Sequence, residues 1–244
     1  LGDVIKNISG VSSINTGSTI VKPIINGLHS SRVLTTFNGV RLQDQEWGIE
    51  HAPNIDINAA GSISVIKGAN ALQYGGDAIG GVIVVNPAKI ILKDSLFGKT
   101  IVSQQSNGKL FSASTSLHKS YKKGWFINGQ ASFKRAGDFE APNYNLTNTG
   151  LNAKAFTLQT GFKKFNKGFE LFYSNTNNEI GILRASHIGN VSDLLTGLKS
   201  DEPLIADDFS YTINNPKQKV THQILKANVY KRLKGIGKLS FQYD

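Results

Sequence analysis

Long runs of alternating residues fill the chain from about Thr100 onward, and they constrain its fold more than any other feature. In Trp125–Lys134, Phe156–Phe162, Phe169–Ser174 and Leu225–Tyr230, apolar side chains alternate with polar ones that are mostly small or carry amides. The longest of these runs, Trp125–Lys134, has ten residues, which is the length that a tilted strand needs to cross a bilayer. The strands of a soluble sandwich are shorter, and their polar face carries more charge. The pattern therefore predicts antiparallel transmembrane β-strands.

The alternation also predicts the direction of individual side chains. We expect one apolar set to point away from the axis of the barrel: Phe156, Leu158, Phe162, Leu171, Leu225 and Val229. We expect Gln159, Ser174 and Asn228 to face inward. A slip of one residue in register would reverse every one of these directions at once.

The connections between the runs alternate in length. Tight turns lie at 122–124, 166–168 and 234–237, whereas longer segments span 136–149 and 179–219. Short turns on one rim and long loops on the other are typical of an outer-membrane barrel. Eight acidic residues lie in the longer segments: Asp138, Glu140, Glu179, Asp193, Asp201, Glu202, Asp207 and Asp208. The segment lengths thus favour a barrel whose long loops face outside.

Ten basic residues cluster around the tight turns: Lys119, Lys122, Lys123, Lys163, Lys164, Lys167, Lys231, Arg232, Lys234 and Lys238. The net charge of +10 alone would suggest a nucleic-acid partner, but this clustering does not. Beside the turns lie Tyr121, Trp125, Phe165 and Phe169, as in an aromatic girdle. Lysines there can contact the phosphates of outer-membrane lipid, although they could also serve only to solubilise surface turns. We expect a lipid partner and no nucleic acid.

Composition excludes several other classes. The chain has no Cys, so it has neither disulfides nor thiolate metal sites. Its five His show no metal-binding spacing, and no nucleophile-elbow pattern indicates a catalytic triad. No apolar run approaches the length of a membrane helix. We therefore expect no enzyme and no cofactor. Because the chain lacks Met and ends inside an alternating run, we also expect a fragment of a longer protein.

Residues 1–90 follow a different pattern, that of a mixed α/β unit. Strand-like segments occur at 32–38, 62–67 and 82–85, and Asn38-Gly39 is a strong signal for a tight turn. The glycine-rich segment 75–81 resembles a phosphate-binding loop. A dinucleotide site, however, needs its glycines to open a helix, and here a strand follows. Close backbone packing explains these glycines more simply.

Several segments of this unit resemble, in order and spacing, the plug domain of TonB-dependent receptors. They are LGDVIKNISGV at 1–11, PIINGL at 23–28, SRVLTTFNGVRL at 31–42, VIKG at 65–68 and LQYGGDAIGGVI at 72–83. The chain departs from the family at Asn26, Gly61-Ser62, Lys67 and Ala69. In the family, charged groups at such positions help to lock the plug to the barrel wall, so the resemblance does not extend to that network.

The resemblance implies a fold class: a mixed α/β plug domain followed by antiparallel transmembrane β-barrel strands, as a fragment of a 22-stranded barrel. It implies a plug at 1–90 and the first roughly seven strands of the barrel at 91–244. It places the protein in the bacterial outer membrane, with TonB as a partner that binds a segment outside this chain. The implied function is active uptake of a scarce nutrient, an extracellular small-molecule ligand such as an iron–siderophore or related metal chelate.

Three alternatives stay open at this point. Within the family, the ligand could be a free metal ion such as zinc or copper, cobalamin or a glycan. Outside it, the chain could belong to a passive porin or an adhesion barrel, or to a soluble β-rich binding module. The ordered plug-like segments argue against a porin, because a porin lacks them.

Three loops of the plug are expected to face the ligand: residues 15–18, 28–31 and 43–51. The candidate ligand-binding residues in the last two are His29, Ser30, Gln45, Glu46, Trp47 and His51. The alternative for Trp47 is that it packs on the barrel wall. His51 and Asp56 could bind a transition metal through imidazole and carboxylate, although such a His is often only hydrogen-bonded.

Overall fold

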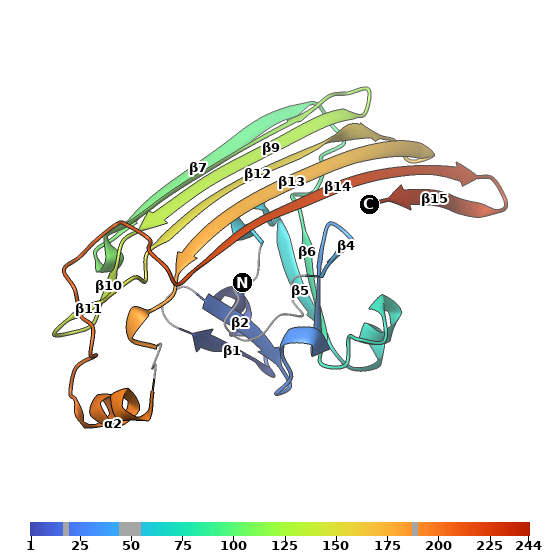
Figure 1. Cartoon of the computed structure of the whole chain (residues 1–244). Helices are drawn as coiled ribbons and strands as arrows, with labels where there is room; N and C mark the ends of the chain where they lie inside the picture. The colour runs from blue at the N-terminus through green and yellow to red at the C-terminus, as the bar shows by residue number, and fades with distance from the viewer. Residues whose placement is uncertain (17–19, 44–54, 187–189) are drawn as a thin grey trace.

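The computed structural model describes residues 1–16, 20–43, 55–186 and 190–244. It consists of a large curved sheet that arches over a smaller mixed domain (Figure 1). No helix in these ranges is both long and apolar enough to cross a membrane.

The large sheet has seven strands in the order β15-β14-β13-β12-β9-β8-β7, and we call it the wall. Its strands are β7 (Ser95–Gln105), β8 (Leu110–Ser120), β9 (Trp125–Ala136), β12 (Leu151–Lys163), β13 (Lys167–Gly181), β14 (Lys217–Leu233) and β15 (Gly237–Tyr243). All neighbouring pairs are antiparallel. This is the meander that tight turns and strict alternation predict.

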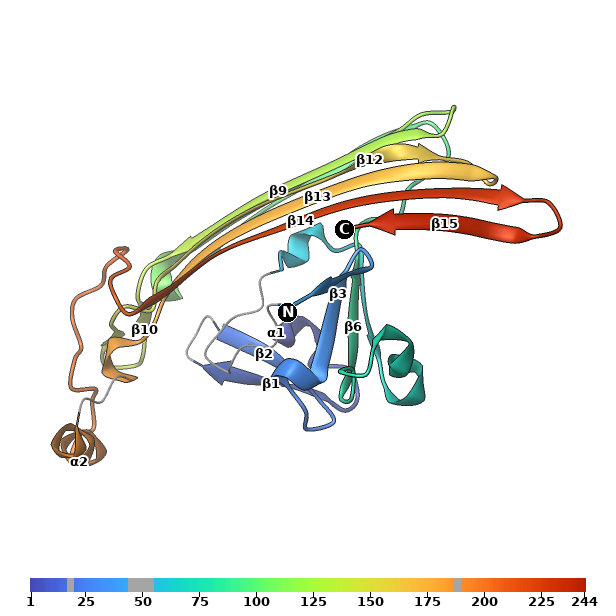
Figure 2. The same cartoon turned by 45° about the vertical axis from the view of Figure 1, so that its right-hand side comes forward.

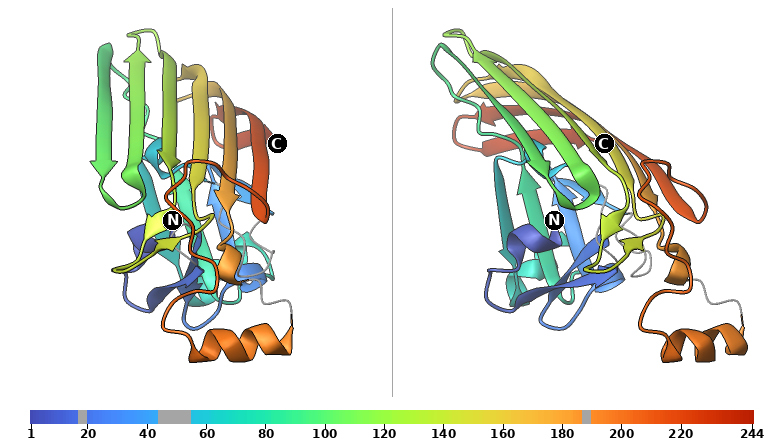
Figure 3. Two further views of the ribbon diagram at one scale, coloured as in Figure 1. Left: turned by 60° about the vertical axis from the view of Figure 1, so that its left-hand side comes forward. Right: turned by 90° about the vertical axis from the view of Figure 1, so that its left-hand side faces the viewer.

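The two ends of the wall differ, as the connection lengths predict. Tight turns join β8 to β9, β12 to β13 and β14 to β15 at one end, which we call the tight-turn end. At this end Lys119 donates a hydrogen bond to Asp94 and holds the pKa of that carboxyl below its ordinary value. The opposite, long-connection end carries the short ladder of β10 (Phe139–Glu140) and β11 (Asn145–Leu146), and α2 (Val191–Lys199) (Figure 3).

The predicted side-chain directions of the wall are confirmed. Gln159 and Ser174 face the smaller domain and are only 4% and 5% exposed, and Asn228 lines a cavity on the same face. The apolar set lies on the other face, where Leu171 and Leu225 are 47% and 61% exposed. Phe162 also lies there, half-buried against the ring of Trp125. The alternation thus assigns the lipid face and the inner face correctly.

The amino-terminal domain, which we call the plug, lies under the concave inner face of the wall (Figure 2). It starts with the single-turn helix α1 (Gly2–Ile5) and a hairpin of β1 (Val11–Thr16) and β2 (Ile20–Ile25). A four-stranded sheet follows in the order β4-β3-β6-β5, with β3 (Val33–Phe37), β4 (Val40–Leu42), β5 (Ser62–Ile66) and β6 (Gly81–Asn86). Only the β3–β6 pair among these is parallel. The expected placement of Val33–Phe37 and Ile63–Ile66 in one small sheet is confirmed.

The glycine-rich segment packs closely against backbone, as the strand pattern after it predicts. Gly81 has φ +138°, and a Cβ there would lie 2.7 Å from the carbonyl oxygen of Ile66. A Cβ on Gly80 would lie 2.9 Å from Leu28 Cβ and 3.0 Å from the carbonyl oxygen of Arg32. These glycines therefore allow neighbouring backbone segments to pack closely, and the strand β6 begins at Gly81.

Candidate functional site

The inner face of the wall is built of side-chain rows that run across the strands. One row is Lys99, Ser116, Gln130, Thr157, Ser174 and Ile224. The next row toward the long-connection end is Ile101, Ser114, Ser132, Ala155, Thr176 and His222. Since each row contributes mainly hydroxyl, amide and small side chains, this face can hydrate or hydrogen-bond whatever lies against it.

The plug touches this face through three contacts of different chemistry, and the first is a carboxylate. Asp56 caps the 3₁₀ turn η3 (Ile57–Ala59): its Oδ1 accepts hydrogen bonds from the backbone N and side-chain Nδ2 of Asn58, at 3.0 and 2.9 Å. Its Oδ2 accepts from Gln130 Nε2 at 2.8 Å and from Ser132 Oγ at 2.7 Å. One carboxylate thus joins the plug to β9 without a paired cation among the described residues.

The second contact is formed by the predicted Asn-Gly turn. Asn38 and Gly39 both have positive φ, +51° and +78°, as the tight turn between β3 and β4 requires. Asn38 Nδ2 donates to Glu170 Oε1 at 2.8 Å, and Lys226 Nζ donates to the Asn38 carbonyl. Lys226 Nζ also lies 3.8 Å from Glu170 Oε1. Two wall residues therefore bind one turn of the plug.

The third contact is apolar and lies beside the second. Phe172 of β13 is fully buried, and its ring meets Phe37 edge to face with the centroids 5.2 Å apart. Phe172 and Ile224 belong to the same buried cluster as Ile25, Ile83 and other plug residues. The wall thus completes the core of the plug, so the inner face is not polar throughout.

The Ile20 end of strand β2 lies at the long-connection end of the wall. Ile20 packs in a buried cluster with Leu110, Ala136, Leu151 and Ile180, which end or begin wall strands there. The plug thus spans the wall from this end down to the level of Glu170.

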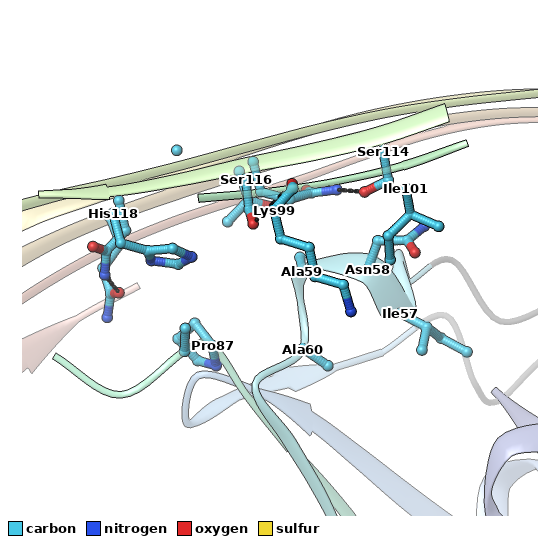
Figure 4. Close-up of a pocket in the computed structure, with 16 residues that line it drawn as sticks. Ile57, Asn58, Ala59, Ala60, Pro87, Lys99, Ile101, Ser114, Ser116 and His118 are labelled. Carbon is cyan, nitrogen blue, oxygen red and sulfur yellow. Dashed lines mark hydrogen bonds between the residues drawn. The ribbon is translucent and has the colours of Figure 1, made fainter. Parts of the chain in front are cut away.

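Two cavities separate the plug from the wall around Asp56. One, of about 300 Å³, lies between η3 and the rows of Ser114, Ser116 and His118 (Figure 4). The other, of about 400 Å³, extends from Asp56 and Ser132 to Gln105 and Leu110 at the long-connection end. In the first cavity the Nδ1 of His118 and the Oε1 of Gln130 are buried and have no hydrogen-bond partner. Both side chains line the cavity, although these two atoms are themselves covered by their neighbours.

The long connections are tied together by buried polar groups. Asp138 is 2% exposed, and its carboxylate accepts from the backbone N of Thr149 and of Ser210. Asn148 donates to the carbonyls of Ile182 and Pro216. In contrast, α2 has no buried residue. The segment that connects β13 to β14 is thus anchored at its two ends, while α2 projects from it.

Of the predicted ligand residues, the structure describes only His29 and Ser30. His29 Nδ1 and Ser30 Oγ are 3.0 Å apart in the connection that follows β2, at the end of this strand opposite Ile20. Gln45, Glu46, Trp47 and His51 lie outside the described residues. Asp56, which the sequence suggested only as a weak candidate for a metal ligand together with His51, is hydrogen-bonded to the wall. No group of three His, Asp or Glu that could hold a metal occurs among the described residues.

The residues of the wall that form these contacts with the plug were not identified from the sequence. Lys226 and Glu170 were visible only as members of alternating runs, and Gln130 and Ser132 as ordinary polar positions. Lys67, where the family more often has Arg, hydrogen-bonds the Ser9 carbonyl inside the plug. The available signal for Lys226 and Glu170 was a charged residue at a position that alternation assigns to the inner face, where most side chains are small and uncharged.

A family model described as TonB-dependent Receptor Plug Domain matches residues 1–82. The vitamin B12 transporter BtuB of Vibrio vulnificus is 25% identical over 176 residues, which are 71% of this chain and 28% of that protein. The vitamin B12 transporter BtuB of Photobacterium profundum is 30% identical over 84 residues, 34% of this chain and 14% of that protein. The chain therefore spans well under half the length of these relatives.

Solved structures share the fold at low identity. The copper transporter OprC aligns with a TM-score of 0.72 and 16% identity, over 99% of this chain and 33% of its own. The unliganded ferric citrate transporter FecA aligns with a TM-score of 0.67 and 13% identity, over 99% of this chain and 36% of its own. The two alignments show that this chain shares the fold of these proteins.

Proposed function

Because this chain is the plug domain and the first barrel strands of a TonB-dependent receptor of the bacterial outer membrane, we propose that it serves the active uptake of a scarce nutrient. We place the plug at 1–90 and the barrel from 91 onward. We also propose that TonB acts on the receptor through a segment outside these 244 residues.

The observation that carries this proposal is the packing of the plug on the inner face of the wall. Phe172 and Ile224 are buried in the plug core, and Asp56 and Asn38 are hydrogen-bonded to the same face. A ligand that moves along this face meets the plug and can pass only if these contacts break. Passive diffusion, as in a porin, does not need such an obstruction, whereas energy-driven transport does.

The charge of the inner face favours an anionic ligand, such as an iron–siderophore or a related metal chelate. Lys99, Lys134 and Lys226 lie on this face together with His118 and His222. Lys226 is paired with Glu170, and the Asp56 carboxylate of the plug also meets this face, so the excess positive charge comes from Lys99 and Lys134. Low-dielectric walls focus such an excess and raise the local concentration of anions. Free metal cations are disfavoured by the same charge.

We propose that the ligand binds first on the plug loops that face the long-connection end. Gln45, Glu46, Trp47 and His51 are the proposed contact residues, and Ile20 of the plug packs at the same end of the wall. His29 and Ser30 stay predicted contact residues, at the opposite end of β2 from Ile20.

A strain that lacks the receptor gene tests this proposal when it is complemented with the full-length protein. We expect radioactive iron to accumulate from one of three anionic ferric chelates, a citrate, a catecholate or a hydroxamate, and accumulation to stop when TonB is deleted. If zinc, copper, cobalamin or a glycan is taken up in the same assay instead, that molecule is the transported ligand and the assignment of a ferric chelate is wrong. Uptake that persists without TonB would contradict active transport and support a porin.

A further inference from the structure

The two cavities between the plug and the wall are stacked along the strands, and Asp56 lies where they meet. The 400 Å³ cavity, which we call the upper cavity, reaches from the Leu110 row to the Ser132 row. The 300 Å³ cavity, the lower cavity, reaches from the Ser114 row, level with Ser132, to the row of His118. Ile57, Asn58, Ile101 and Ser114 line both cavities. They are therefore neighbours along one path from the long-connection end toward the tight-turn end.

The Asp56 carboxylate crosses this path at the boundary. Its Oδ2 binds Ser132, which lines the upper cavity, and Gln130, which lines the lower cavity. When both bonds are broken, η3 keeps its own cap through Oδ1 and Asn58, so the turn itself does not have to unfold. The bonds to the wall can thus open independently of the local fold.

The lower cavity has the chemistry of a binding site rather than of packed protein. Gln130 is 7% exposed, and its Oε1 has no partner although its Nε2 donates to Asp56. His118 Nδ1 is likewise unpartnered. Lys99 adds a cation, and no carboxylate lines this cavity. The polar residues Ser114, Ser116 and Asn128 also line this cavity, so a hydrated polar molecule can be hydrogen-bonded there, and a small shift of Gln130 or His118 would give their unpartnered atoms a partner.

We propose that Asp56 closes a polar passage along β8, β9 and β12, and that the lower cavity is a transit site for a hydrated, anionic small molecule. This inference rests on the proposed function, because it describes the route that the same ligand takes after it leaves the plug loops. Together the two cavities offer about 700 Å³ (300 and 400 Å³), within the usual range for a small-molecule site.

Cysteine accessibility in the full-length receptor tests the passage, and the 244 residues contain no Cys to interfere. Ser112→Cys places a thiol in the upper cavity, and Ser116→Cys places one in the lower cavity on the same strand. Fluorescein-5-maleimide, an anionic reagent, is added to intact porin-deficient cells. We expect Ser112→Cys to react whether or not Asp56 is present. Ser116→Cys should react at least about tenfold faster after Asp56→Ala, because two hydrogen bonds to a charged acceptor are lost.

The control variants separate a gate from a loosened plug. Asn38→Ala breaks the contact with Glu170 and leaves Asp56 intact, so it should not accelerate labelling of Ser116→Cys. Equal acceleration by Asn38→Ala, or a rate at Ser116→Cys that does not depend on Asp56, overturns the proposal.

In the Asp56→Ala background, small methanethiosulfonate reagents of either charge test the ligand class. The anionic reagent should react faster than the cationic one, and the reverse order overturns the anionic assignment.

The milder variant Asp56→Asn covers the case in which Asp56→Ala fails to fold. It should give intermediate labelling, with heat-modifiable gel migration and protease resistance of the plug unchanged. The assay requires neither a nutrient nor TonB. A failed uptake experiment with intact gating would therefore overturn the proposed function alone, and failed gating with intact uptake would overturn the passage alone.

Discussion

Replacement of Phe172 by Ala should release the plug from the wall while the barrel remains intact. The ring is 0% exposed, meets Phe37 at 5.2 Å and lies in the plug core although it belongs to β13. Truncation of a fully buried Phe to Ala costs about 3–5 kcal/mol, and loss of the edge-to-face pair is part of that cost. Because the wall strands keep their hydrogen-bonded ladder, this cost should fall on plug docking.

Urea unfolding of the plug measures this effect. A fluorophore on Ser12→Cys, an exposed residue of β1, reports the plug, and heat-modifiable gel migration reports the barrel. With an m-value of about 1–3 kcal/mol per M, a loss of at least 3 kcal/mol lowers the midpoint of the plug transition by at least about 1 M. The barrel transition should not move.

Phe156→Ala is the matched control, because this ring lies on the opposite face of the wall and is 44% exposed. It should leave the free energy of unfolding of the plug within about 0.5 kcal/mol of that of the parent protein. If the two variants lower the plug midpoint equally, or if Phe172→Ala leaves it unchanged, the assignment of Phe172 to plug docking is refuted.

Three further outcomes are expected in the full-length receptor. Lys226→Met should destabilise the plug by about 1–3 kcal/mol in the same urea assay, because the charged donor to Asn38 is lost, and an unchanged midpoint would contradict this. Gly81→Ala should prevent the plug from folding, as seen by protease digestion, since its φ is +138°. Gly76→Ala should be tolerated there because nothing lies within 4 Å of the added Cβ. Trp47→Ala should weaken binding of the transported chelate in an equilibrium binding assay, without a change in heat-modifiable migration.

Local patterns were sufficient to predict several strands of the wall and of the plug and the faces of the wall strands, but not the hairpin of β1 and β2, the strands β7 and β8, or the helix α2. The alternation of strands has a period of two, so the directions of Gln159, Ser174 and Leu171 follow from sequence alone once the strand is recognised. The Asn38-Gly39 turn was equally local, because positive φ at both positions favours these two residue types. Each of these features depends on residues only a few positions apart.

The partners across the plug–wall interface could not be predicted in the same way. Phe172 lies on the face that alternation marks as polar, and its partner Phe37 lies in a different domain of the chain. The sequence offered Asp56 as a metal ligand because carboxylates suit metals, whereas its hydrogen bonds to Gln130 and Ser132 depend on the docking of one domain on another. Such contacts have no signal in a single sequence.

From the sequence, the plug loops 15–18 and 28–31 were expected to share one surface that faces the ligand, because both are polar and lie between strand-like segments. The geometry of the strand between them argues for a separation. Between them runs β2, Ile20–Ile25, which carries the chain about 20 Å from one end of the hairpin to the other. Successive connections of a hairpin lie at opposite ends. His29 therefore lies at the opposite end of β2 from Ile20.

The contacts that hold the plug differ in strength, and this difference predicts where it opens first. Phe172 contributes about 3–5 kcal/mol through burial, and water cannot replace that contact. Asp56 is held by two hydrogen bonds next to cavities, where water or a ligand can replace Gln130 and Ser132 as donors. The Asp56 side should therefore open while Phe172 remains docked as a hinge. Labelling of Ser116→Cys should then respond more strongly to Asp56→Ala than to Phe172→Ala, and the opposite order would place the hinge at Asp56.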